Sequence, residues 1–175
     1  MNYFFDKINA TYSQWLYVAL LLVLCIAALM IFTRKGVIYI QLKRMLTVMF
    51  VEYLVVLFCF TIIFREESVE RDFRYVLYRN YLVNDMRLFM DALMNVAMFI
   101  PVGFCTSVLL RRPKWLKILL LSGTLSCCIE LSQYILSRGC CDTNDVINNT
   151  IGGLFGYFVY RIVRIIRKAP LNPPA

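Results

Sequence analysis

The sequence predicts an all-α membrane protein, a polytopic transmembrane helical bundle of about five spans. Of its 175 residues, 61% are hydrophobic and 17% are charged, whereas a soluble domain carries about a quarter charged residues. The apolar residues form five runs, each near the roughly 20 residues that a helix needs to cross a bilayer. Charged residues gather between these runs. We therefore expect one transmembrane domain over residues 1–168.

The five expected spans cover residues 14–32, 45–64, 88–110, 115–137 and 145–166. The preceding segment, 1–13, has neither a basic stretch nor a small-residue cleavage site, so no cleaved signal peptide is expected. The final segment, 169–175, reads APLNPPA. It is too rich in proline to fold by itself and is expected to be a disordered cytoplasmic tail.

Charge asymmetry between the connecting segments predicts the orientation. Segments 33–44, 111–117 and 161–168 each hold four basic residues and no acidic one. Segment 1–13 holds one of each sign, 65–87 holds five of each, and 138–145 holds one basic and two acidic residues. Basic loops stay in the cytoplasm, which places the N-terminus outside and the C-terminus in the cytoplasm. The net charge of +8 thus reflects membrane topology, and no nucleic-acid partner is expected.

Polar residues inside the spans gather at one depth. Glu130 lies about 10 Å below the outer end of its span, Asn95 lies at a similar depth, and Asn148 and Asn149 begin the last span. Ser122, Ser126, Glu130 and Gln133 share one helical face. Ionisable groups within a bilayer are costly and point to function, so we expect a polar pocket open to the outside. The predicted ligand-binding residues are Asn95, Glu130, Gln133, Arg138, Asp142, Asp145, Asn148, Asn149 and Arg74.

Several of these residues also have a structural interpretation. Asp142 and Asp145 fit an N-cap followed by an acid at the third helical position. Gly152 and Gly156 form a GxxxG pattern, which is typical of close helix packing. Pro101 fits a helix kink. These interpretations do not exclude a second role in binding.

The segment 65–87 is long, charged and aromatic. It can be an amphipathic segment on the outer surface, with tyrosines at the level of the lipid headgroups. Alternatively, it is a lid over the pocket whose arginines, Arg74 among them, meet an anionic headgroup such as a phosphate. The same arginines, and Arg138, are candidate partners for the buried acid Glu130.

Cysteine and histidine usage argues against a cofactor or metal. The chain has no histidine, which excludes His-based triads and most zinc sites. Its seven cysteines form no CxxC pair, and five of them lie in apolar runs, where cysteine behaves as a small hydrophobic residue. Cys140 and Cys141 are adjacent, and we expect two free thiols there.

Two blocks of sequence resemble the VanZ-like family. The first is Asn95 to Phe104, NVAMFIPVGF, and the second is Glu130 to Tyr157, with the pattern ExxQ followed by DxxDVxxNTxGGxxG. The family positions fall on Asn95, Pro101, Gly103, Glu130, Gln133, Asp142, Asp145, Asn149, Thr150, Gly152 and Gly156. The resemblance covers roughly residues 70–160. It implies an integral membrane protein of the bacterial cytoplasmic membrane, in some members linked to lower sensitivity to teicoplanin-type lipoglycopeptide antibiotics.

Three functions remain open at this stage. The first is a non-enzymatic protein that binds an amphiphile at the outer leaflet, either a lipoglycopeptide antibiotic or an envelope lipid. The second is a membrane-embedded enzyme acting on an envelope lipid or glycoconjugate, with Glu130 or Asp145 as acid or base. The third is a small transporter or flippase. Membrane lipids are expected partners, and a homodimer through the last helix is a further alternative.

Overall fold

A computed structural model describes residues 37–63, 73–74, 86–110, 113–139 and 141–168. The helices in these ranges are α2 (Val37–Phe58), α4 (Met86–Leu109), α5 (Trp115–Ile135) and α6 (Thr143–Lys168). A π-helical turn, η1 (Cys59–Ile63), continues α2, and two short strands, β1 (Phe73–Arg74) and β2 (Cys141–Asp142), pair with each other. The predicted all-α class is confirmed.

Three helices are long and apolar enough to cross a membrane within the described ranges: Val37–Ile63, Phe89–Leu109 and Trp115–Ile135. They correspond to the second, third and fourth expected spans. α6 is a helix of 26 residues and is not among these three candidate spans. The expected span at 14–32 lies outside the described residues. The total of five spans and the orientation therefore stay predictions.

The helix α2 begins earlier than expected. It starts at Val37, whereas the sequence pattern predicts that this span starts at residue 45, with Lys43 and Arg44 in the preceding loop. Both side chains are exposed on the helix. Long basic side chains extend from a helix end toward water while their stems stay on apolar surface, so a helix can continue through them.

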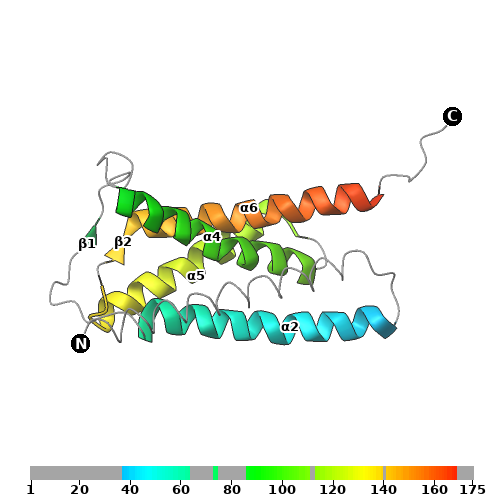
Figure 1. The fold of residues 1–175 in the computed structure, drawn as a ribbon, viewed down its shortest axis with the longest axis horizontal. Helices are drawn as coiled ribbons and strands as arrows, with labels where there is room; N and C mark the ends of the chain where they lie inside the picture. Colours follow the sequence, from blue (N-terminus) through cyan, green and yellow to red (C-terminus); the bar gives the residue numbers. More distant parts are fainter. Residues whose placement is uncertain (1–36, 64–72, 75–85, 111–112, 140, 169–175) are drawn as a thin grey trace.

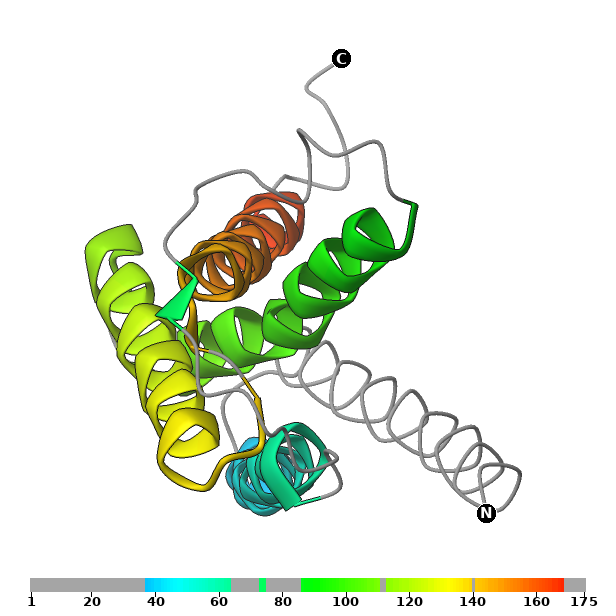
Figure 2. The same cartoon turned by 90° about the vertical axis from the view of Figure 1, so that its left-hand side faces the viewer.

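The four helices pack in alternating directions (Figure 1). α2 and α5 run one way, and α4 and α6 run the other way. Seen end on (Figure 2), α4 lies between α6 and α2, and α5 packs along the other side of α6. Both strands lie at one end of the bundle, where α5 ends and α6 begins.

The core lies mainly between α2 and α4. It is formed by Leu46, Phe50, Tyr53, Leu57, Phe99, Val102, Phe104, Cys105, Ile129 and Tyr160. Within it, the Tyr53 hydroxyl donates a hydrogen bond of 2.7 Å to the Met98 carbonyl. By contrast, the outside of the bundle is apolar: Val55, Leu120 and Ile162 are each more than half exposed. Apolar surface on this scale fits lipid rather than water.

Glycines bring α6 and α4 into backbone contact. A Cβ atom at Gly152 would overlap the Val96 carbonyl, and one at Gly156 would overlap the Ile100 carbonyl. Glycine is therefore needed at both positions for this helix separation. The face of α6 that carries the GxxxG pattern thus packs against α4 of the same chain.

Candidate functional site: a buried polar seam

A line of polar side chains is buried where α6 meets α5. Glu130 and Asn149 are only 2% and 5% exposed, and a period of three to four residues puts the α5 members on one helical face. We call this group the polar seam. Its members are Ser122, Ser126, Glu130 and Gln133 of α5, and Asn144, Asn148 and Asn149 of α6, all of them buried.

Glu130 holds the loop that joins the two helices. Its Oε2 atom accepts a hydrogen bond of 2.9 Å from the backbone N–H of Asp142 in β2. The acceptor is a buried carboxyl group and the donor belongs to the backbone just before α6. Glu130 therefore fixes β2 over the end of α5, which is a structural role that the sequence did not reveal.

Asp142 caps the N-terminus of α6. Its Oδ1 atom accepts hydrogen bonds from the Asn144 backbone N–H (2.8 Å) and from Asn144 Nδ2 (3.0 Å). Asp145 follows in the first turn of the helix, where a negative charge is favoured by the helix dipole. The N-cap interpretation of Asp142 is confirmed.

The short parallel pairing of β1 with β2 brings segment 65–87 to the same place. Phe73 is the backbone partner of Cys141, and Arg74 is the partner of Asp142. The backbone of residue 74 therefore lies beside the residue that donates to Glu130. The rest of the expected lid, residues 64–72 and 75–85, lies outside the described residues, as does the side chain of Arg74.

Gln133 and Arg138 connect α5 to the end of α2. Gln133 Nε2 donates to the Thr61 carbonyl (3.0 Å), and Arg138 donates to the Ile63 carbonyl (3.1 Å). Carbonyls at the C-terminal end of a helix lack intrahelical donors, and a positive charge there is favourable. Both side chains thus cap the π-helical turn η1.

The position of Arg138 follows from how α5 ends. Ser137 has a φ of 54°, and the Arg138 N–H donates to the Gln133 carbonyl at 2.8 Å. Together with the bond from the Ser137 N–H to the Tyr134 carbonyl, this is a Schellman motif with serine in the left-handed position. The chain turns at this motif and starts back toward α6.

Asn149 has unused hydrogen-bonding capacity. Its Nδ2 atom donates a bond of 2.8 Å to Ser126 Oγ. Its Oδ1 atom, and the Oγ atom of Ser122, are buried without a hydrogen-bond partner in the described part of the chain. Buried polar atoms are normally satisfied, so these two atoms require an explanation.

Asn95 lies on α4 and is partly buried. The next residue, Val96, contacts Gly152 of α6 through its carbonyl. Since α4 and α6 run in the same direction, Asn95 lies about one turn along from the level of Asn148. Asn95 therefore lies near the contact between α4 and α6, and not at the contact between α5 and α6.

A shallow apolar groove of about 400 Å³ runs along α5 beside the polar seam. It is lined by Leu119, Leu120, Gly123, Thr124, Cys127, Cys128, Leu131 and Thr150. Gly123, Cys127 and Thr150 each directly follow a seam residue in the sequence. The groove and the seam are thus adjacent faces of the same two helices. For the ranges described, no three His, Cys, Asp or Glu side chains are grouped as a metal site requires.

Comparison with known proteins places the chain in a family. A model of the VanZ/LLP1 family matches residues 14–164. The chain belongs to the VanZ/LLP1 family. It is also 37% identical over 76 residues to Protein VanZ of Enterococcus faecium, a match that covers 41% of this chain and 45% of that relative. The match thus spans less than half the length of this relative, and no solved structure matches the chain.

The resemblance inferred from the two motif blocks is therefore confirmed, and the chain is a multi-pass VanZ-family membrane protein. The functional importance of the polar seam is not tested by the family match. The sequence places Ser122 and Ser126 on one helical face with Glu130 and puts Thr150 among the family positions, although none of the three is among the predicted ligand-binding residues. The backbone groups of Thr61, Ile63 and Asp142 were not predicted, because every residue carries such groups.

Proposed function

We propose that this VanZ-family protein binds an amphiphile in the outer half of the bacterial cytoplasmic membrane. The polar head lies at the polar seam and the apolar chain lies in the groove on α5. The observation that carries the proposal is the pair of buried, unsatisfied oxygens of Asn149 and Ser122 directly beside an apolar groove. An amphiphile offers both a hydrogen-bonding head and a chain for the groove.

The ligand is a lipoglycopeptide antibiotic or an envelope lipid. The relative of the same family is named Protein VanZ, and the family resemblance suggests lower sensitivity to teicoplanin-type antibiotics. Holding the lipid tail of such an antibiotic, or an envelope lipid that the antibiotic needs, would reduce access of the drug to its target. Asn149 and Glu130 are the residues expected to contact the head.

Photo-crosslinking in native membranes tests this proposal. A diazirine-bearing alkyl lipid is expected to label α5 between Leu119 and Leu131, and Gly123→Phe, which fills the groove, is expected to remove most of that labelling. Val55→Phe is the control, because Val55 is an exposed apolar residue of α2 that does not line the groove. Equal labelling of both variants and of the unmodified protein would show that the groove is not a binding site.

The other functions stay predictions with their own tests. Turnover of a defined lipid by the purified protein would support an enzyme with Glu130 or Asp145 as acid or base. Proton-dependent movement of a lipid in reconstituted vesicles would support a transporter or flippase. A homodimer through α6 would have to use a surface other than its Gly152–Gly156 face, which packs against α4.

A further inference from the structure

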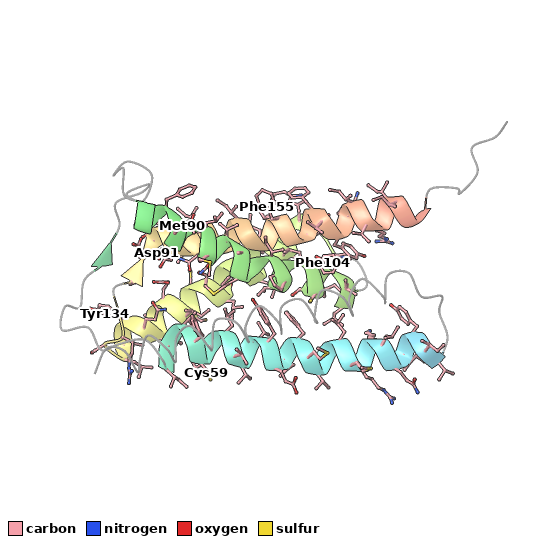
Figure 3. All side chains as sticks on the ribbon, viewed as in Figure 1. Cys59, Met90, Asp91, Phe104, Tyr134 and Phe155 are labelled. Carbon is pink, nitrogen blue, oxygen red and sulfur yellow. The ribbon has the colours of Figure 1, made fainter. Side chains whose placement is uncertain are left out.

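Basic side chains gather at the end of the bundle that lies opposite β2. The helices α2 and α5 begin at this end, and α4 and α6 finish there. Figure 3 shows Asp91 at the other end, the one that carries β2. By sequence, the segments 33–44, 111–117 and 161–168 hold no acidic residue, so an anionic partner is favoured at this end. The described charged side chains here are Lys43, Arg44, Lys114, Lys117, Arg161 and Arg164.

Lys43 and Arg44 differ from residues at a helix end, because they lie within the apolar surface of α2. The helix starts at Val37, six residues before Lys43, which is about 9 Å at 1.5 Å per residue. In that stretch Val37 and Ile38 are 73% and 65% exposed, and the candidate membrane span also starts at Val37. A cation surrounded by apolar surface in a membrane is costly unless an anion meets it.

The two basic residues line a hollow on one face of α2. The hollow has a volume of about 540 Å³ and is lined by Ile40, Lys43, Arg44, Thr47 and Val48, which recur at the spacing of a single helical face. All five side chains are exposed. Val51, which is 53% exposed, continues this face toward the middle of the helix. The hollow thus offers two cations with an apolar strip beside them.

The neighbouring polar residues of α2 do not neutralise this pair. Glu52 is the first acidic residue of the helix and lies eight residues beyond Arg44. That is about 12 Å along the axis, well outside the three- or four-residue spacing at which helical side chains pair. The Thr47 hydroxyl donates a hydrogen bond of 2.8 Å to the Lys43 carbonyl, so it adds no free donor. Recognition in the hollow therefore depends on the two positive charges and the apolar strip.

From these observations we infer that Lys43 and Arg44 bind the phosphate of an anionic phospholipid, whose acyl chain lies along Val48 and Val51. Arginine meets a phosphate through two parallel N–H donors, and lysine adds a point charge. A soluble anion would use only the cationic part of the hollow, whereas a phospholipid also covers the apolar strip. This inference does not depend on the proposed function, because the hollow is on α2 and the groove is on α5.

Photo-crosslinking with two lipids tests the inference. Phosphatidylglycerol and phosphatidylcholine, each with the same diazirine-bearing acyl chain, are compared on the full-length protein in phosphatidylcholine nanodiscs. Both probes carry the phosphate, but choline adds a compensating positive charge. One basic residue near a membrane surface favours an anionic lipid by roughly fivefold. We therefore expect about twentyfold more labelling of α2 between Val48 and Val55 by phosphatidylglycerol.

Matched double variants locate the effect. Lys43→Gln with Arg44→Gln is expected to reduce the preference at α2 to about twofold. Lys114→Gln with Lys117→Gln removes the same number of charges from the same end, on exposed side chains that do not line the hollow, and is expected to keep the preference above about tenfold. Thr47→Val alters the lining without changing its charge and is expected to have no effect.

Two results would overturn the inference. One is equal labelling of α2 by both lipids. The other is an equal loss of preference in the two double variants, which would assign the preference to the overall charge of this end. If the variant of Lys43 and Arg44 does not fold, each single substitution is expected to lower the preference to about fivefold, and an unchanged preference in both contradicts the site. Absence of labelling in the α5 groove would contradict the proposed function alone.

Discussion

The two faces of α6 make different kinds of contact with their neighbouring helices. Toward α4, Gly152 and Gly156 allow backbone contact with Val96 and Ile100. Toward α5, Asn149 bonds to Ser126, and two further oxygens are left unsatisfied. Close packing depends on the absence of side chains, whereas the polar face carries side chains with hydrogen-bonding capacity to spare.

This difference suggests that the two faces of α6 have different roles. The α4 face is saturated, because no additional atom fits between the two backbones. The α5 face is where a ligand could add contacts, because its polar atoms gain by being bonded. The contact between α5 and α6 also has a structural role, because Glu130 of α5 accepts a hydrogen bond from the Asp142 N–H of β2. Variants of each face should therefore separate stability from ligand binding.

The largest effect is expected on the glycine face. Gly156→Ala places a Cβ atom against the Ile100 carbonyl and the Phe104 backbone nitrogen, so α4 and α6 must separate. We expect a loss of about 3 kcal/mol or more in the free energy of unfolding. Thermal unfolding of the detergent-solubilised protein measures it.

The matched control is Gly123→Ala on α5. There a Cβ atom would lie 3.5 Å from Thr150 Oγ1, which is an ordinary contact. Because alanine has the higher helix propensity, this variant is expected to be unchanged or more stable by up to about 1 kcal/mol. If both substitutions destabilise the protein equally, the contrast between the two faces is wrong.

The second largest loss of stability is expected for substitutions of Glu130. Glu130→Ala leaves the partly buried Asp142 N–H without its acceptor, which is expected to destabilise the protein by about 2 kcal/mol. Glu130→Gln keeps an acceptor oxygen and is expected to cost less. A comparison of their unfolding temperatures tests this order. Equal stability of the two variants would mean that the Asp142 contact contributes little.

The helices could be predicted more accurately than the contacts of the polar seam. The spans expected at 88–110 and 115–137 agree with Phe89–Leu109 and Trp115–Ile135 to within about two residues, because charged segments and Pro113 bound these apolar runs. The predicted start of the second span is wrong, because Lys43 and Arg44 resemble loop residues but belong to α2. A basic residue near the end of a span does not show whether the helix has ended.

The faces of the site residues were predictable, and their partners were not. Helical spacing alone puts Glu130 and Gln133 on one side of α5. It does not show that their partners are backbone groups of Asp142 and Thr61, because every residue carries such groups. The two-residue strand at Phe73–Arg74 is also too short to produce a period-two pattern.

The cap of α6 should give an intermediate effect. Asp142→Ala removes the acceptor for the Asn144 N–H and is expected to cost about 1 kcal/mol. Asp142→Asn retains a side-chain oxygen at the N-cap and is expected to be nearly neutral. Both can be compared by thermal unfolding. A larger loss in Asp142→Asn than in Asp142→Ala would contradict the capping role.

A smaller change in stability is expected for Asn149→Leu. The variant removes the 2.8 Å hydrogen bond to Ser126, which lowers stability. It also removes the buried, unsatisfied Oδ1 atom, which raises stability, so the two effects largely offset each other. We expect a change of no more than about 1 kcal/mol in the free energy of unfolding. Together with reduced labelling of α5 by the diazirine-bearing lipid, this result would identify Asn149 as a binding residue rather than a structural one.

The smallest expected effect is a change in the reactivity of the Cys141 thiol, which lies close to Glu130. Burial raises the pKa of this thiol, and the neighbouring Glu130, Cys127 and Asp142 raise it further. In a Cys140→Ser background, a membrane-impermeant maleimide should react slowly at pH 7 and faster as the pH rises, because the thiolate is the reactive form. Glu130→Gln removes one negative charge, which lowers the pKa and should speed the reaction at pH 8. An unchanged rate in that variant would indicate that the Glu130 carboxyl does not raise the pKa of Cys141. A Cys140→Ser, Cys141→Ser double variant gives the background rate.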